Sequence, residues 1–261
     1  MSEPVEVRHA ATVVVVRGEG ADAEVLLLRR GDTAGFMAGM FVYPGGRLDP
    51  ADLDAAAGDI DTAARWTALR ECFEESGLLL ATDHLGQPAT PDHVAALRSS
   101  DAPFAEALQA LALRPGLQAL RPFARWVTPT VERRRFDTRF YLAPHPDGQE
   151  AEADGFEMVE HRWRRPADAL QEYASSSMLL SPPTFYFLAD LAEQLAAGVQ
   201  LHDWADAQPL HPVVPRLELT DSPRLLLPGD ADYPSEQPVS GPTRMLLVDG
   251  RWQRHTVRHS A

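Results

Sequence analysis

Three glutamates stand within five positions of the segment TALRECFEESGLLL, residues 67–80, at Glu71, Glu74 and Glu75. Residues at i, i+3 and i+4 share one face of an α-helix, so their carboxylates repel one another, and Arg70 is not spaced to neutralise all three. Such a face becomes favourable when carboxylate oxygens hold a hard divalent cation such as Mg²⁺ or Mn²⁺. The alternative is an ordinary solvated helix face, and the surrounding sequence must decide between the two.

Short strands are predicted upstream of the glutamates. The runs ATVVVV and EVLLLRR are β-branched or apolar, and RGEGADA between them predicts a hairpin with a glycine-containing loop. MFVYPGG is a third apolar run, whose proline and paired glycines predict a turn. A helix follows, with Asp61 or Thr62 as its predicted N-cap and Gly77 as its predicted end. The glutamates therefore belong to a strand-turn-helix unit.

The helix is predicted over residues 63–75. At about 100° per residue, Trp66, Leu69 and Phe73 share one face, and the three glutamates lie on the opposite one. We expect the apolar face to pack inward and the glutamates to face a cleft.

Beyond this helix the chain alternates between helical and strand patterns. Helical spacing broken by prolines predicts a helical insertion near residues 91–120, packed on the sheet. Strands are predicted at FARWVTP, FDTRFYLA and FEMVEHRW, and helices at PADALQEY and PTFYFLADLAEQLAAG. Further on, Asp249 and Gly250 predict a two-residue hairpin. We expect one domain over residues 1–202 and a C-terminal extension over residues 203–261 that packs on the same domain.

The composition limits the class of protein. Hydrophobic residues at 44% and charged residues at 24% are ordinary for a globular protein. The single cysteine, Cys72, excludes an internal disulfide and fits a reducing compartment. No run reaches the roughly 18–20 apolar residues of a membrane span, and no basic leader stands at the N-terminus, so we expect a cytoplasmic location without a membrane partner. A net charge of -14 argues against binding to nucleic acid.

The glycine pair and the glutamate helix together carry a known pattern. GGRLDPAD, residues 45–52, and RECFEESGL, residues 70–78, resemble the signature of the Nudix hydrolases. That signature runs glycine, five residues, glutamate, seven residues, and then Arg-Glu, an apolar residue, any residue, Glu-Glu, any residue, glycine and an apolar residue. Residues 70–78 match every fixed position of its second half. The resemblance implies an α/β fold: an α/β/α sandwich with a mixed, curved sheet, to which the helical insertion and the C-terminal extension are added.

The first half of the signature departs from the family pattern. Five residues after Gly46 comes Asp52, where the family has glutamate, and residues 53–69 separate it from Arg70 in place of the usual seven. The extra stretch LDAAAGDIDT is expected to loop out, because surface insertions cost little. Such an interrupted box resembles the coenzyme A diphosphatase subgroup, as do LLLRRGDTAGFMAGMFVYPGG, WVTPTVERRRFDTRFYLA, LLSPPTFYFLADL and LLPGDADYP. Whether Asp52 replaces the missing glutamate is open at this point.

The resemblance assigns roles to the residues of the box. It implies that Glu71, Glu74 and Glu75 hold Mg²⁺ or Mn²⁺, which would activate water and stabilise the leaving phosphate. Glu71 and Glu75 are then catalytic candidates, with Glu71 also the candidate base, and Arg70 orients a carboxylate through a bidentate pair.

Substrate contacts are expected from two further segments. Gly45 and Gly46 would let the backbone approach the phosphates. The segment ERRRFDTRF supplies cations for an anionic substrate, although side chains on a strand alternate between faces and at most about half point at one site. Arg135 is the candidate chosen from Arg133, Arg134, Arg135 and Arg139.

Glu157 leads into MVEHRW, where many Nudix enzymes carry an additional acid on a loop opposite the helix. It is a candidate further ligand or alternative base, and Glu152, Asp154 and Glu160 are its rivals. Cys72 stands at an apolar position of the box without a recognisable partner His or Asn, so a buried thiol is expected there and not a nucleophile.

The implied activity is metal-dependent hydrolysis of the diphosphate in a nucleoside diphosphate derivative. Coenzyme A or an acyl-coenzyme A is the first hypothesis, with 3′,5′-ADP and phosphopantetheine as products. ADP-ribose, NADH and dinucleotides are alternatives, because LLLRRGDTAGFMAGM does not match the threonine position and the further arginines of the strict coenzyme A pattern. A non-catalytic Nudix-like module that binds a nucleotide and regulates a partner is an alternative of another class, and the intact second half of the box favours the enzyme.

Overall fold

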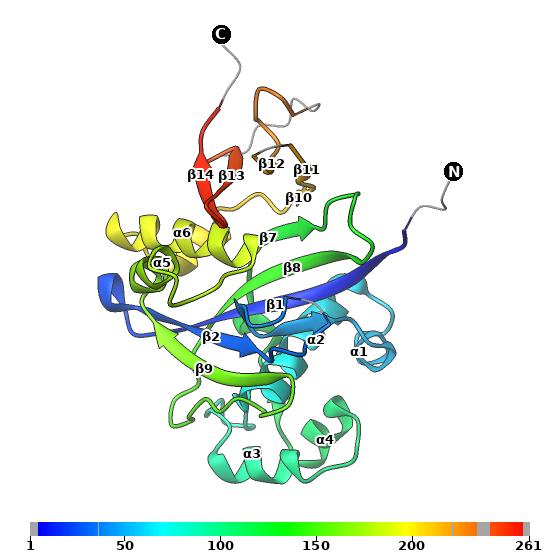
Figure 1. The fold of residues 1–261 in the computed structure, drawn as a ribbon. Helices are drawn as coiled ribbons and strands as arrows, with labels where there is room; N and C mark the ends of the chain where they lie inside the picture. The colour runs from blue at the N-terminus through cyan, green and yellow to red at the C-terminus, as the bar shows by residue number, and fades with distance from the viewer. Residues whose placement is uncertain (1–4, 36, 221, 234–240, 258–261) are drawn as a thin grey trace.

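A mixed sheet forms the centre of the chain (Figure 1). The computed structural model describes residues 5–35, 37–220, 222–233 and 241–257. In these ranges the sheet has eight strands in the order β10-β7-β8-β1-β2-β3, with β4 paired to β1 and β9 paired to β2. The strands are β1 Val7–Arg17, β2 Glu24–Arg30, β3 Phe41–Val42, β4 Gly45–Arg47, β7 Arg121–Val127, β8 Arg135–Pro144, β9 Met158–Arg164 and β10 Pro212–Val213. The β1–β8 and β10–β7 pairs are parallel and the others antiparallel, which confirms the mixed sheet.

Helices cover both faces of this sheet, which confirms the three layers. Val13 packs in the cluster shared with α2 (Ile60–Ser76), whereas Val14 packs in the cluster shared with α5 (Pro166–Ala174) and α6 (Pro182–Ala196). Side chains alternate between the faces of a strand, so a strand buried on both faces needs a continuous apolar run. The VVVV of β1 and the VLLL of β2 supply such runs, and β1 and β2 form the predicted hairpin.

The stretch before the glutamate helix is helical, so the predicted loop is wrong. Helix α1, Pro50–Ala55, begins with a capping box between Asp49 and Asp52. Helix α2 then begins at Ile60, because the Asp59 side chain accepts the Thr62 amide at 2.8 Å. The predicted N-cap at Asp61 or Thr62 was therefore two or three residues late, since both lie inside the first turn. The predicted end is confirmed, because Gly77 is left-handed with φ of 70°.

The helical insertion packs on α2 and not on the sheet as predicted. Its helices are α3, Pro91–Arg98, and α4, Phe104–Ala110, and the short strands β5, Ala81–Thr82, and β6, Arg114–Pro115, pair beside them. The ring of Phe104 lies 5.9 Å from that of Phe73 on α2, which is the face that the sheet leaves uncovered. In Figure 1 these helices lie away from α5 and α6. No helix in the described ranges is long and apolar enough to cross a membrane.

The C-terminal extension is tied to the main sheet at its start. Helix α7, Leu201–Asp206, runs through the predicted boundary between residues 202 and 203, and β10 pairs with β7. Four antiparallel strands follow, with Leu225 and Met245 buried in the same cluster as α6. They are β11 Arg216–Glu218, β12 Arg224–Leu226, β13 Arg244–Val248 and β14 Arg251–His255. The predicted hairpin between β13 and β14 is confirmed, with positive φ at Asp249 and Gly250.

Candidate active site

Helix α2 packs on the sheet and carries Glu71 and Glu75 beside β4. Ala64, Ala68 and Cys72 are fully buried against β1 and β2, and Leu69 joins them, whereas Phe73 packs on the helical insertion. The helix is thus buried on two sides, which a single apolar face did not predict. Burial raises the pKa of the Cys72 thiol to about 12, so the thiol stays protonated and the prediction of a buried thiol is confirmed.

Arg70 is the centre of an ion network beside the acids. Its side chain is only 10% exposed and donates to Glu71 Oε1 at 2.9 Å and to Glu74 Oε2 at 2.8 Å. Burial disfavours the charged guanidinium, but the hydrogen bond to Asp52 and the charges of Glu71, Asp52 and Glu74 outweigh it and raise the pKa of Arg70. Arg70 therefore stays charged and fixes two of the box glutamates in place.

Asp52 is held by the same guanidinium. Arg70 Nη2 donates to Asp52 Oδ2 at 2.8 Å and Nε donates to Oδ1 at 3.1 Å, and the Thr67 hydroxyl donates to Oδ2 at 2.9 Å. This bidentate pair is buried, with Asp52 4% exposed. Because Asp52 lies on α1, the pair fixes α1 against α2. The structure thus gives the aspartate of the interrupted box a definite partner, which the sequence left open.

Glu71 lies against the backbone of Gly46. A Cβ added at Gly46 would stand 2.4 Å from Glu71 Oε1, so any larger residue there would displace the Glu71 carboxylate. Burial raises the pKa of Glu71 to about 7, and the nearby charge of Arg70 only partly offsets it. Near neutral pH the positive charge of Arg70 therefore does not fully compensate the cost of burying the Glu71 carboxylate.

Glu75 is buried beside Gly45. Its Oε2 accepts the Gly45 amide at 2.9 Å, and the residue is 4% exposed. Burial first, and then the charge of Glu71, raise the pKa of Glu75 well above its ordinary value. The glycine pair does not form the predicted turn. It lies in β4, which pairs antiparallel with β1. Because glycine has no side chain, β1 lies close to Gly45 and Glu71 of α2 lies close to Gly46.

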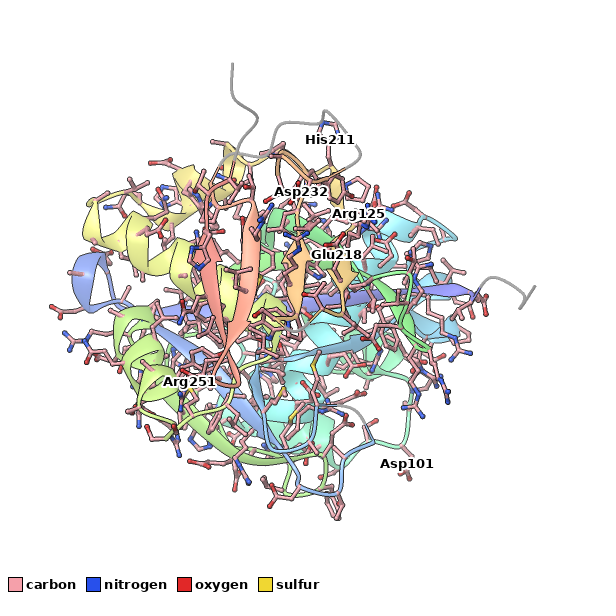
Figure 2. All side chains as sticks on the ribbon, turned by 45° about the horizontal axis from the view of Figure 1, so that its top comes forward. Asp101, Arg125, His211, Glu218, Asp232 and Arg251 are labelled. Carbon is pink, nitrogen blue, oxygen red and sulfur yellow. The ribbon has the colours of Figure 1, made fainter. Side chains whose placement is uncertain are left out.

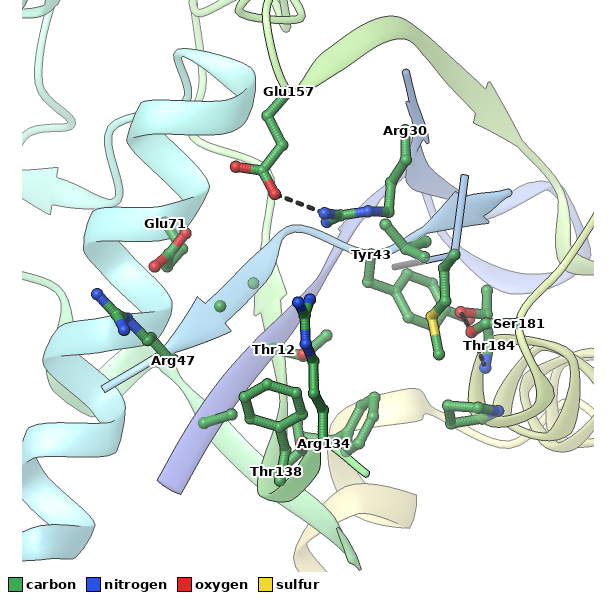
Figure 3. A pocket seen from close by; sticks show the side chains of 18 residues that line it. Thr12, Arg30, Tyr43, Arg47, Glu71, Arg134, Thr138, Glu157, Ser181 and Thr184 are labelled. Atoms are coloured by element: carbon green, nitrogen blue, oxygen red, sulfur yellow. Dashed lines mark hydrogen bonds and ion pairs between the residues drawn. The ribbon is translucent and has the colours of Figure 1, made fainter. Parts of the chain in front are cut away.

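Glu157, the residue predicted as an additional acid, lines the same cavity as Glu71, which Figure 3 shows. Its Oε1 accepts from Arg30 Nη2 at 2.7 Å. Its rivals are engaged elsewhere: Glu152 pairs with Arg98, Asp154 accepts backbone amides of its own turn, and Glu160 pairs with Arg162. The geometry therefore favours Glu157 among the four.

A cavity of about 430 Å³ is lined by Glu71 and Glu157, whereas Glu74 and Glu75 are not among its lining residues. Figure 3 shows Glu71 and Arg47 at one side of it, and Ser181 and Thr184 at the other. Between them lie apolar and hydroxyl side chains from β1, β8 and the segment before β4. Lining residues that were not predicted include Thr12, Arg30, Met37, Tyr43, Arg47, Phe136, Thr138, Phe140, Ser181 and Thr184.

Arg134, and not the predicted Arg135, lies on this cavity (Figure 3). Along β8 the side chains of Phe136, Thr138 and Phe140 line the cavity, so the odd-numbered residues face the other way. Arg135 accordingly donates through Nε to the carbonyl oxygen of Thr128 at 3.1 Å. Arg134 immediately precedes β8 and continues the series of even-numbered residues that line the cavity.

The predicted metal ligands are not gathered around one point. In the described ranges, no group of three or more Asp, Glu, His or Cys side chains stands ready to hold a metal ion. Arg70 draws Glu74 to one side, and the Gly45 amide draws Glu75 to another. The donor chemistry nevertheless fits a hard cation, because carboxylate oxygens suit such an ion, and burial together with the charges of neighbouring acids raises the pKa of Glu71 and of Glu75.

These shifts predict how stability depends on pH. The folded state binds the Glu71 proton more tightly than the unfolded chain, so without divalent cations the free energy of unfolding should fall as pH rises from about 4.5 to about 7. The Glu71→Gln variant should lack this part of the fall, on the order of 2–3 kcal/mol. Thermal midpoints in chelator between pH 5 and 8 measure the difference. Equal pH slopes in both proteins would contradict the assignment to Glu71.

Comparisons with known proteins agree with this geometry. The family model of the NUDT19 Nudix domain matches residues 55–191. Putative nudix hydrolase 7 of Caenorhabditis elegans is 30% identical over 93% of this chain and 80% of its own length. Acyl-coenzyme A diphosphatase NUDT19 of Xenopus laevis is 26% identical over 87% of this chain and 76% of its own length. The crystal structure of a NUDIX hydrolase from Alicyclobacillus acidocaldarius is 33% identical, covers 80% of this chain and 99% of that chain, and superposes with a TM-score of 0.67.

The fold, the box on α2 and these matches show that the chain belongs to the Nudix hydrolase family. Within that family it resembles the coenzyme A diphosphatase subgroup, as the interrupted box predicted. The chain is therefore an enzyme, a Nudix diphosphatase acting on a small molecule, and the non-catalytic alternative is set aside.

Proposed function

We propose that this enzyme uses a divalent cation to cleave the diphosphate of coenzyme A or an acyl-coenzyme A. The observation that carries the proposal is the charge pattern of the cavity. Glu71 and Glu157 line one end of it. Burial raises the pKa of Glu71 there, so a bound cation would stabilise its charged carboxylate. Arg47 and Arg134 line the same cavity and offer cations to phosphate oxygens. Carboxylates for a metal and arginines for phosphates are thus side by side.

Glu71 and Glu75 are the residues that we expect to hold Mg²⁺ or Mn²⁺, with Glu157 as a further oxygen donor. When bound, the cation would neutralise diphosphate oxygens and lower the pKa of a water molecule. Glu71 or Glu157 would accept the proton of the attacking water. Arg70 keeps the Glu71 carboxylate in orientation, and Arg30 does the same for Glu157.

The choice of coenzyme A rests on the relatives and on the shape of the cavity. Three relatives of 25 to 28% identity are named acyl-coenzyme A diphosphatases. Beyond the acidic end, the cavity offers neutral hydroxyls and rings, which suit the uncharged pantetheine arm. ADP-ribose, NADH and dinucleotides carry a second ribose or base in this position. The cytoplasmic location and the lack of a nucleic-acid partner stay predictions.

The proposal is tested by incubating the protein with coenzyme A, with either Mg²⁺ or a chelator. Water adds to one phosphorus and the P–O–P bond breaks, so 3′,5′-ADP and phosphopantetheine should appear together and only with the cation. Product masses identify both fragments. Cleavage that continues at the same rate in chelator would contradict the cation requirement, and an intact coenzyme A would contradict the substrate.

A further inference from the structure

We propose that a second cavity, of about 400 Å³ between β7, α6 and the C-terminal extension, receives the acyl chain of the substrate. The inference rests on the proposed function, which it narrows to coenzyme A thioesters of medium or long acyl chains. In Figure 2, Arg125 and His211, which line this cavity, lie beside the C-terminal sheet.

The two cavities are neighbours on one face of the sheet. Thr138 and Phe140 of β8 line the first cavity. Their direct partners on β7 are Trp126 and Ala124, which line the second. Directly paired residues point to the same face, and adjacent strands lie about 4.8 Å apart. The second cavity therefore begins about one strand beyond the first.

Helix α6 covers both cavities. Ser181 and Thr184 at its start line the first, and Phe187 and Asp190, one to two turns on, line the second. Side-chain rings stand where the two meet: the Phe140 and Phe187 centroids are 4.6 Å apart. Both rings are buried, so they separate the two cavities. An extended ligand in the first cavity would reach the second by displacing these rings.

The lining of the second cavity suits an uncharged occupant. Its charged groups are already neutralised, because Arg125 Nε donates to Asp137 at 2.7 Å and Arg254 Nη2 donates to Asp190 at 2.7 Å. The Tyr186 hydroxyl donates to the carbonyl oxygen of Pro242 at 3.1 Å. The rest of the wall is mainly aromatic, proline and aliphatic. A phosphate would find no spare cation here apart from the exposed His211, whereas an alkyl chain would lose its contact with water.

The first cavity offers what the intervening pantetheine arm requires. The hydroxyls of Thr12, Thr138, Ser181 and Thr184 line it. The Tyr43 hydroxyl is buried and has no hydrogen-bond partner in the described part of the chain. Amide groups of the arm could use such donors and acceptors. The diphosphate would then lie at the acidic end, the pantetheine arm in the hydroxyl-lined middle, and the acyl chain in the apolar second cavity.

The test compares free coenzyme A with dodecanoyl-coenzyme A in the presence of Mg²⁺. Val213→Trp fills the second cavity from β10, and Leu210→Trp is its matched control, because Leu210 is 47% exposed and does not line the cavity. We expect Val213→Trp to lower kcat/KM for the dodecanoyl thioester by at least about tenfold and to leave that for free coenzyme A within about twofold. Leu210→Trp should change neither.

A second measurement uses the unaltered cavity in case Val213→Trp fails to fold. A dodecanoyl thioester with a terminal bromine should quench the fluorescence of Trp126 and Trp204, and the double change of both to phenylalanine should remove that quenching. Two results would overturn the acyl-chain site and leave the proposed function standing. One is unchanged turnover of the dodecanoyl thioester by a folded Val213→Trp protein, and the other is undiminished quenching in the double phenylalanine variant. Wild-type protein that cleaves neither compound overturns the proposed function as well.

Discussion

Glu75→Gln is expected to lower kcat for diphosphate cleavage by roughly 10²-fold or more, because a cation's stabilisation of the transition state is worth several kcal/mol. Glutamine has nearly the volume of glutamate but lacks its negative charge and its strong donation to a hard cation. The measurement is the rate of 3′,5′-ADP release with saturating Mg²⁺.

The same variant should remain folded. The glutamine amide oxygen can still accept the Gly45 amide, and loss of a buried charge relieves the repulsion from Glu71. Relief of a like-charge pair on an exposed helix stabilises by about a few tenths of a kcal/mol, and because Glu75 is buried we expect a larger gain without metal. Glu106→Gln on α4, at an exposed position, is the matched control and should change neither property. A Glu75→Gln protein with full turnover would contradict the catalytic role.

Arg70→Met is expected to lose about 3–5 kcal/mol of unfolding free energy, because removing one partner of a buried ion pair leaves uncompensated charge. Asp52 would keep only the Thr67 hydroxyl and the Asp49 amide, and Glu71 and Glu74 would lose their shared donor. Denaturant unfolding in chelator at pH 7.5 measures the loss. Turnover should fall with it, since Glu71 loses its orientation.

Arg98→Met is the matched control for that loss. Arg98 donates to Glu152 at 3.1 Å, but both side chains are largely exposed, so the change should cost no more than about 1 kcal/mol. If Arg70→Met were as stable as Arg98→Met, the network around Arg70 would have no structural importance.

The elements of the fold follow from patterns that are local in the chain. A doubly buried strand such as β1 needs a continuous apolar run, and left-handed backbone at Gly77 ends α2. The first residue of α2 could not be predicted from the local sequence, because Asp59, Asp61 and Thr62 are all favourable N-cap residues. In the structure Asp59 is the cap, because its side chain accepts the Thr62 amide. The ten extra residues lie partly in α1 and partly in α2, and residues 56–59 connect the two helices.

The acids of the site could be predicted from their spacing, but not the directions of their side chains. Glu71 and Glu74 both accept from the Arg70 guanidinium, whereas Glu75 accepts from a backbone amide on another element. The residues that complete the cavity come from strands and from the start of α6, far apart in sequence. Arg135 was chosen over Arg134 because the face of β8 that lines the cavity depends on tertiary packing, which no local pattern shows.

The most direct test is competition between substrates. An equimolar mixture of coenzyme A, dodecanoyl-coenzyme A, ADP-ribose, NADH and a diadenosine polyphosphate is incubated with the protein and Mg²⁺, and the products are followed by mass. We predict that the two coenzyme A compounds disappear first and yield 3′,5′-ADP with phosphopantetheine or its acyl form. Prior release of AMP from ADP-ribose, NADH or the dinucleotide, with coenzyme A and its thioester intact, would contradict a coenzyme A diphosphatase.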